Sequence, residues 1–360
     1  MSVARTQQTQ SSDDTPTMRY SIFSVQDHYP ETAYPGHKRT VPQLYQEVTD
    51  QARLADRLGY DTFFVAEHHF HEYGAVPNPA VMLAHLAAQT QRIRLGSAIS
   101  ILTFHDPRVV AESYAMLDSL SGGRLVMGVG SGYLKHEFEG FGIDGAEKRE
   151  RFDENLDLVK RLLAGERVTH QGTYQHLDGV QLNVPPVQQP HPPIKVAVLR
   201  AEAAYHVGRA GHDLVSVPYA SVDDWDEIAP LVTSFREGRE AAGRPVGPDD
   251  AILALHTHVA ETDKAVRRNT EKPFDLYVDS RLYAKKQTFD DILASGLSLF
   301  GTPETVADKL VELHEMGVRH VMMLQNFGHM PPETVERSMT LIAEEVMPRV
   351  EQRLRREATA

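Results

Sequence analysis

Residues 67–72 hold the richest group of ionisable side chains in the sequence, Glu-His-His-Phe-His-Glu. They follow Thr62–Ala66, an apolar run with β-branched and aromatic residues that predicts a buried strand. Imidazoles and carboxylates at such a place can transfer protons near neutral pH or bind a metal ion. We therefore expect one or two of them to act in catalysis. A solvated His-rich loop is the alternative, since the chain has 18 histidines.

Small residues mark two further segments. Gly96-Ser97-Ala98 would let a flat ring lie against the backbone, or would simply pack in the core. Gly128–Tyr133 imitates a dinucleotide fingerprint, but Tyr133 stands where the last glycine belongs, so we interpret it as a loop that approaches a ligand. Arg149 begins a helical stretch, where a guanidinium can hold a phosphate or can be a solvated surface group.

Eight short apolar runs alternate with longer stretches of helical period, which is the pattern of βα units around a parallel sheet. The runs are Arg19–Val25, Thr62–Ala66, Ile93–Ile99, Leu125–Gly130, Ile194–Val198, Leu214–Val217, Ile252–Val259 and Val318–Leu324. The count predicts an α/β fold, a (β/α)8 TIM barrel, whose usual size is about 250 residues; an open sheet is the alternative. In a barrel the functional side chains lie in the loops that follow the strands.

The length beyond a minimal barrel is predicted to lie in insertions. Val168–Pro193, after the fourth strand, has the alternation of a small hairpin with a proline-rich return. Lys272–Phe300, after the seventh, is polar and aromatic with no clear period. We expect one barrel domain over residues 18–356, closed by a helix from Pro332 to about Arg356, and a disordered N-terminal tail over residues 1–17.

Composition excludes several function classes. The net charge is −13, which disfavours nucleic acid and anionic lipid as partners. The absence of cysteine excludes disulfides, iron–sulfur clusters and a cysteine nucleophile. No apolar run is long enough to span a membrane, and the simplest compartment is the cytoplasm.

A metal-dependent hydrolase is one alternative function. His69 and His71 have the spacing of paired ligands in amidohydrolase-type barrels. Those enzymes also need histidines after the fifth and sixth strands and an aspartate after the eighth. Here the residues that follow those strands are Leu199-Arg200, Pro218-Tyr219 and Gln325-Asn326, so we expect no metal site.

Taken together, several motifs occur in the order seen in one family. They are Glu67-His68-His69-Phe70, Gly96-Ser97-Ala98, Leu117-Asp118, Ser121-Gly122-Gly123-Arg124, Phe138 through Phe141-Gly142, Arg149, Gly301-Thr302-Pro303-Glu304 and Glu345-Val346-Met347-Pro348. Over residues 18–356 the sequence resembles the luciferase-like flavin-dependent monooxygenases. The resemblance implies a (β/α)8 barrel, in agreement with the strand count.

The resemblance also implies roles for individual residues. His68 matches the family's catalytic histidine, which lies near the reactive edge of the flavin, and Glu67, its neighbour in the motif, is expected to be a second catalytic residue. Ala98 and Ile99 match a non-prolyl cis peptide beneath the flavin ring.

Four further positions match the family's cofactor contacts. Gly130 matches a position close to the flavin carbon that takes up oxygen. Ser131 and Arg149 match positions near the flavin phosphate. Arg200 stands in a loop where the family has hydroxyl side chains, and it could contact the phosphate in their place.

The function implied is a monooxygenase that uses reduced FMN and O2 to oxygenate a medium-sized organic substrate through a flavin (hydro)peroxide. The loops after the first and eighth strands are expected to contact that substrate. Their candidate residues are His28, His37, Phe327 and His329. A deazaflavin-dependent dehydrogenase on the same barrel and a non-catalytic flavin-binding subunit are alternatives.

Two protein partners are expected. Relatives of this kind bind flavin weakly between turnovers, which implies a separate NAD(P)H:flavin reductase, and nothing in the chain resembles a nicotinamide domain. A stripe of small residues on one predicted helix favours a homodimer, or else packs on the barrel. It consists of Ala80, Ala84, Ala87 and Ala88.

Overall fold

A computed structural model of the chain describes residues 18–247, 250–281 and 286–358. The predicted disordered tail, residues 1–17, lies outside the described residues.

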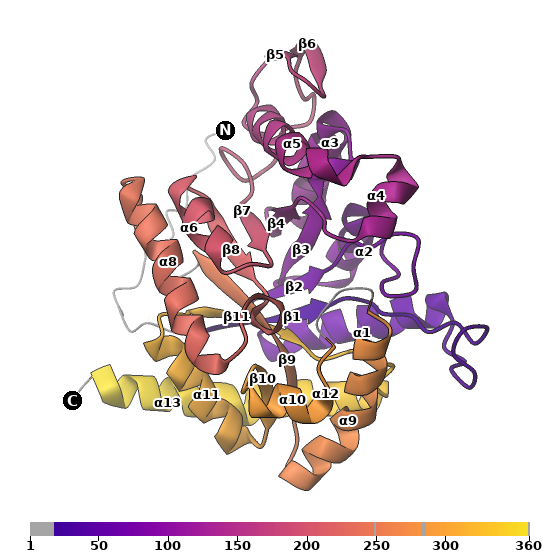
Figure 1. The fold of residues 1–360 in the computed structure, drawn as a ribbon, viewed down its shortest axis with the longest axis vertical. Helices are drawn as coiled ribbons and strands as arrows, with labels where there is room; N and C mark the ends of the chain where they lie inside the picture. Colours follow the sequence, from indigo (N-terminus) through magenta and orange to yellow (C-terminus); the bar gives the residue numbers. More distant parts are fainter. Residues whose placement is uncertain (1–17, 248–249, 282–285, 359–360) are drawn as a thin grey trace, which may run out of the picture.

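Eight parallel strands close into a barrel, which confirms the predicted fold (Figure 1). In order around the barrel they are β1 (Arg19–Ser24), β2 (Thr62–Val65), β3 (Arg94–Ile101), β4 (Leu125–Gly130), β7 (Ile194–Val198), β8 (Asp213–Ser216), β9 (Ala251–Val259) and β11 (His320–Leu324). The last strand pairs with the first, with Arg19 opposite His320. All eight carboxyl ends therefore meet at one mouth of the barrel.

Helices surround the strands, and local sequence signals set their ends. They include α1 (Val41–Leu58), α2 (Pro79–Gln89), α3 (Pro107–Ser121), α5 (Lys148–Leu163), α6 (Glu202–Arg209), α8 (Ile228–Ala241) and α11 (Pro303–Glu315). Helix α1 begins at a capping box in which Thr40 and Gln43 satisfy each other's backbone N–H groups. Helix α3 begins with a proline after the N-cap Asp106 and ends at Gly122 in the left-handed conformation.

The first insertion contains the expected hairpin. Strands β5 (Val168–Gln171) and β6 (His176–Val180) pair antiparallel outside the barrel, at the top of Figure 1. The return segment is fixed to α3, because Gln188 donates from its backbone and side chain to the buried carboxylate of Asp118.

The second insertion is more regular than predicted. Lys272–Phe300 shows no clear period in the sequence, yet helix α9 (Asp263–Asp279) runs into it and is followed by α10 (Phe289–Ala294) and β10 (Ser298–Gly301). Strand β10 pairs in parallel with the end of β9. Helix α9 was hard to recognise from the sequence, because Pro273 lies within it and only a narrow face of the helix is buried.

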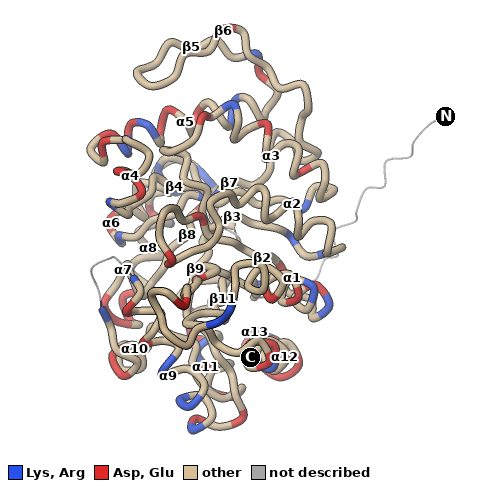
Figure 2. The backbone as a smooth tube through the Cα atoms, turned by 90° about the vertical axis from the view of Figure 1, so that its right-hand side faces the viewer, with Lys and Arg blue, Asp and Glu red and all other residues tan. Residues whose placement is uncertain are grey.

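The predicted closing helix is one continuous stretch with an irregular turn. It comprises α12 (Pro332–Leu341), a π-helical turn (Ile342–Val346) and α13 (Met347–Ala358). Acidic and basic residues interleave along the outer helices (Figure 2). No helix in the described part of the chain is long and apolar enough to cross a membrane.

Candidate active site

The loop after β2 places His68 inside the mouth of the barrel. The residue is only 8% exposed, and its Nδ1 lies 3.2 Å from Oε1 of Glu137. The imidazole packs on the ring of Tyr73, with ring centres 4.5 Å apart. Gly74 lies so close that a Cβ added there would be 2.9 Å from the Cβ of His68. The ring is therefore held between a carboxylate on one side and a packed backbone on the other.

Glu137 belongs to a short helix, α4 (Lys135–Phe141), that covers this loop. Its carboxylate is fully buried, and Oε1 also accepts the backbone N–H of His69 at 3.0 Å. The other oxygen, Oε2, has no hydrogen-bond partner among the residues that the structure describes. Beneath α4 a small apolar cluster, separate from the main core, joins Phe138 to Ile101 and Phe104.

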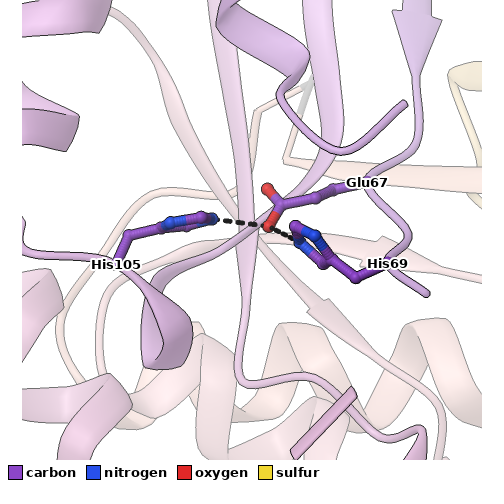
Figure 3. A group of neighbouring side chains, drawn as sticks. All are labelled: Glu67, His69 and His105. Carbon is purple, nitrogen blue, oxygen red and sulfur yellow. Dashed lines mark hydrogen bonds and ion pairs between the residues drawn. The ribbon is translucent and has the colours of Figure 1, made fainter. Parts of the chain in front are cut away.

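Glu67 forms a second network (Figure 3). Its Oε1 contacts Nε2 of His69 at 2.9 Å and Nε2 of His105 at 2.6 Å, so the two imidazoles point toward one oxygen. Its Oε2 accepts the backbone N–H of Ile101 at 3.1 Å. The carboxylate of Glu67 thus joins the loop after β2 to the end of β3, and its hydrogen bonds go to these residues and not to His68.

Burial and hydrogen bonding oppose each other in this network. Burial alone would raise the pKa of Glu67, but the hydrogen bonds from His105 and His69 outweigh it and hold the pKa below its ordinary value. Burial alone would lower the pKa of His105. The hydrogen bond and the charge of Glu67 outweigh that effect, and the net result is a raised pKa. The lowered pKa of Glu67 and the raised pKa of His105 both favour an ion pair between these two side chains.

The same three side chains offer the donor types of a cation site. The ligand atoms of Glu67, His69 and His105 lie within 4.8 Å of one another. The pair considered from the sequence, His69 and His71, is not brought together as ligands: Nδ1 of His71 accepts the backbone N–H of Tyr73, and its Nε2 lies 3.8 Å from Glu72. The contacts of Glu67 are those of a hydrogen-bonded network.

The peptide bond between Ala98 and Ile99 is cis, as the resemblance implied. Gly130, at the end of the neighbouring strand β4, is buried against it. A Cβ at position 130 would lie 2.2 Å from Cδ1 of Ile99, so only glycine allows this approach without displacing that side chain. These residues give the mouth a narrow backbone-lined wall beside β3 and β4.

The residues proposed to hold a phosphate lie on the outer part of the mouth. Ser131 is half-buried, and its carbonyl accepts from the hydroxyl of Thr103 at 3.0 Å. Arg149 is exposed on the first turn of α5, where it pairs with Asp153 at 2.9 Å. Arg200 is exposed in the loop after β7 and lines an open groove of about 630 Å³ that also contains His206 and Ser221.

Three of the four expected substrate residues lie close together. His37 and His329 approach at 2.8 Å between their Nδ1 atoms, and both stand beside the ring of Tyr29. Burial, with the positive charge of Arg39, lowers the pKa of His329 to about 4, so its ring is neutral near pH 7. His28 lies in the same loop after β1 and is half-buried.

Phe327 does not share this setting. It is fully buried in an aromatic cluster with His256, Phe274 and Tyr277, at ring-centre distances of 5.3 to 6.2 Å. It therefore supports the loop after β11 from within the core.

Two residues of the site were missed from the sequence. Glu137 lies between Gly128–Tyr133 and Phe138, outside the recognised motifs, and His105 follows β3 in a segment without any charge pattern. Each pairs with a residue of the His-rich loop that is far away in the chain, 69 positions for Glu137 and 38 for His105. The only sequence signal for these two residues was their position: His105 follows β3 and Glu137 follows β4, which are neighbouring strands of the barrel.

Comparisons with known proteins agree with this fold. Residues 18–320 match the family described as luciferase-like monooxygenase. The chain is 30% identical to the solved structure of the monooxygenase RslO1 from Streptomyces bottropensis, with a TM-score of 0.84 over 92% of this chain and 99% of that one. It has the fold of the oxygenating constituent of 3,6-diketocamphane monooxygenase from Pseudomonas putida, solved with FMN, with 20% identity, a TM-score of 0.79 and 92% and 98% of the chains covered.

Curated relatives include two kinds of enzyme. The oxygenase component of a flavin-dependent trigonelline monooxygenase from Acinetobacter baylyi is 28% identical, over 69% of this chain and 66% of that protein. An F420-dependent glucose-6-phosphate dehydrogenase from Kineococcus radiotolerans is 31% identical, over 65% and 71%.

Proposed function

The chain belongs to the luciferase-like monooxygenase family, and from that premise we propose that it is a flavin-dependent monooxygenase that uses reduced FMN and dioxygen to oxygenate a medium-sized organic substrate. The observation that carries the proposal is the buried pair of His68 and Glu137 at the mouth of the barrel, beside the wall formed by Ala98, Ile99 and Gly130.

The residues at the mouth fit a flavin. The wall at Ala98, Ile99 and Gly130 is suited to a flat ring system, because the small residues Ala98 and Gly130 expose backbone that a ring can approach closely. Arg200 and Ser221, in the groove after β7 and β8, offer a guanidinium and a hydroxyl for a phosphate. We propose Ser131 and Arg149 as further phosphate contacts at the outer rim.

Each protein group has a definite task in the proposed reaction. Reduced flavin, when bound, supplies the electrons for the reaction with dioxygen. His68 holds or transfers a proton at its imidazole. Glu137 orients that ring by accepting from Nδ1, so that Nε2 is the nitrogen left for the reacting groups. Glu67 fixes the loop that carries His68.

We also propose that a separate reductase supplies the reduced flavin. The relative from Acinetobacter baylyi is described as an oxygenase component, which supports a two-component system. The low affinity expected for flavin between turnovers would allow the cofactor to pass between the two proteins.

A homodimer is proposed on the outer face of α2 and α3. The large apolar side chains Val81, Val109, Met116 and Leu120 on these two helices are 55–68% exposed. The last three follow one stripe of α3 at helical spacing. Of the small-residue stripe on α2, Ala80 and Ala87 are buried in the core, so Ala84 and Ala88 are the members left to approach a second copy.

The proposal is tested by mixing the protein anaerobically with reduced FMN, admitting oxygen and following flavin absorbance in the near ultraviolet. We expect a long-lived species that decays faster in the absence of protein. In parallel, His68→Ala should bind reduced FMN with unchanged affinity, measured by fluorescence titration, while coupled product yield falls at least about a hundredfold. An unchanged yield would remove His68 from the reaction.

The F420-dependent relative makes a second cofactor worth a direct comparison. Tighter binding of reduced deazaflavin than of reduced FMN, with anaerobic turnover, would replace the monooxygenase by a dehydrogenase.

A further inference from the structure

Gln26, directly after β1, is buried without any partner for its side chain. The residue is 0% exposed, and neither its amide nitrogen nor its amide oxygen has a hydrogen-bond partner in the described part of the chain. A buried polar group normally finds a partner, because losing water without a replacement costs about 1–3 kcal/mol. A buried amide with both ends unpartnered therefore indicates a group that binds there.

The position of Gln26 links it to His68. The backbone carbonyl of Gln26 accepts the backbone N–H of Ala75 at 2.9 Å. The backbone carbonyl of Val76, the residue after Ala75, accepts the backbone N–H of His68 at 3.1 Å. Gly74 packs on the imidazole itself. One short segment thus contacts both the backbone of Gln26 and the candidate catalytic ring.

Further unpartnered polar atoms lie beside Gln26. Asp27 is 1% exposed; its Oδ2 accepts from the hydroxyl of Tyr29 and the backbone N–H of Gly328, both at 2.6 Å. Its Oδ1 accepts nothing from the residues described, and Nδ1 of His28 is likewise buried and unpartnered within them. The group combines a donor at Gln26 with acceptors at Gln26 and Asp27.

Aromatic rings stand next to this polar group. Tyr29 and His329 are parallel, with an interplanar angle of 4°, and Tyr34 and His37 surround them at ring-centre distances of 5.0 to 6.4 Å. Gln26 and His329 both have positive φ, 56° and 57°, a conformation that costs a non-glycine residue about 1–2 kcal/mol. Neighbouring aromatic rings favour an aromatic partner, and mixed donors and acceptors favour a hydroxyl, which donates and accepts at once.

We propose that the amide of Gln26, with the free oxygen of Asp27, binds the hydroxyl group of a phenolic substrate next to His68. This inference deepens the proposed function, on which it rests for treating the mouth as a substrate site. It narrows the medium-sized organic substrate to hydroxylated aromatic compounds.

The test compares two probes, 2-naphthol and naphthalene, bound to the full-length protein and followed by probe fluorescence. Wild-type protein should bind 2-naphthol at least about tenfold more tightly than naphthalene, because naphthalene leaves the amide unsatisfied. Gln26→Met, nearly equal in volume, should abolish the preference, while Gln91→Met, at an exposed position, should keep it. Equal binding of both probes by the wild type, or no binding of either, would overturn the assignment.

Two further readouts make the outcome decisive. If Gln26→Met keeps the preference and instead weakens FMN binding, the amide is a cofactor contact and the inference is wrong. If that variant does not fold, Asp27→Asn, which keeps an acceptor for Tyr29, should reduce the preference, and a full preference in Asp27→Asn would contradict the site. Failure of the oxygen-reaction test with an intact preference for 2-naphthol would count against the monooxygenase and not against this site.

Discussion

The Oε1 atom of Glu137 lies 3.2 Å from Nδ1 of His68 and 3.0 Å from the backbone nitrogen of His69. One carboxylate oxygen therefore fixes both the ring and the backbone of the His-rich loop. Since the carboxylate comes from α4 and the imidazole from the loop after β2, the pair exists only when α4 is seated on the barrel.

Glu137→Gln tests the orienting role. Glutamine keeps the shape but removes the charge that anchors the ring, so kcat should fall by roughly tenfold or more with little change in reduced-FMN affinity. The matched control is Glu139→Gln on the same helix, where Glu139 makes an exposed ion pair with Lys135. Equal kcat for both variants would show that Glu137 has a structural role only.

Gly74→Ala should damage the site without touching an ionisable group. The added Cβ would lie 2.9 Å from the Cβ and Cδ2 of His68, so the ring must move away from its present position. We expect kcat to fall by about tenfold, since a shift of roughly 1 Å at a reacting group has large effects. Gly145→Ala is the control, because a Cβ there meets nothing within 4 Å; comparable losses in both would refute the packing argument.

The ion pair of Glu67 and His105 predicts a pH dependence of stability. The raised pKa of His105 contributes stability that is complete below its ordinary value of 6.5 and is lost as pH rises through the folded value. The lowered pKa of Glu67 contributes stability present above its ordinary value of 4.5 and lost as pH falls through the folded value.

The contribution of the pair should therefore be largest between those two ordinary values. Urea denaturation of wild type and His105→Asn should differ by about 1–3 kcal/mol near pH 5.5. The difference should shrink in alkaline solution. A difference that is constant across this range would mean that His105 is neutral in the folded protein.

The ion-pair network of Glu67, His69 and His105 is predicted to hold no metal ion, and metal analysis and chelation test this. We expect elemental analysis to find zinc and manganese well below one equivalent, and EDTA to leave both melting temperature and activity unchanged, because the ion pair already satisfies Glu67. Stoichiometric metal with a fall in melting temperature on chelation would identify these three residues as ligands.

Leu120→Lys on α3 should weaken the proposed dimer. A charge at this 62% exposed apolar position disfavours burial against a second copy, so sedimentation should show a shift toward monomer. Leu293→Lys on α10, also an exposed apolar position, should leave the association state unchanged. A wild-type protein that sediments as a monomer would contradict the interface.

The sequence was sufficient for the barrel because its strands are short buried runs between recognisable turns. Leu125–Gly130 and Ile194–Val198 have the bounds that their apolar runs predicted, and the other six agree within two residues. Strand β10 escaped detection because four residues carry too little pattern to separate a strand from its surroundings.

The site was predictable only in part. The type of residue that follows β2 pointed to His68, and the cis bond at Ala98 followed from a family resemblance. The pairing of His68 with Glu137 could not be deduced, because it depends on how far α4 folds back over the mouth. The roles proposed for His68, Ser131, Arg149 and Arg200 stay predictions.

The small apolar cluster under α4 has a consequence for dynamics. Because Ile101, Phe104 and Phe138 form a core of their own, α4 can open locally at a smaller free energy than the barrel strands need for global unfolding. Amide hydrogen exchange should therefore be faster in α4 than in β3 or β4. The orientation of His68 then depends on the equilibrium between seated and open α4. Substitutions that weaken the packing of Phe138 should therefore lower activity strongly while the melting temperature hardly changes.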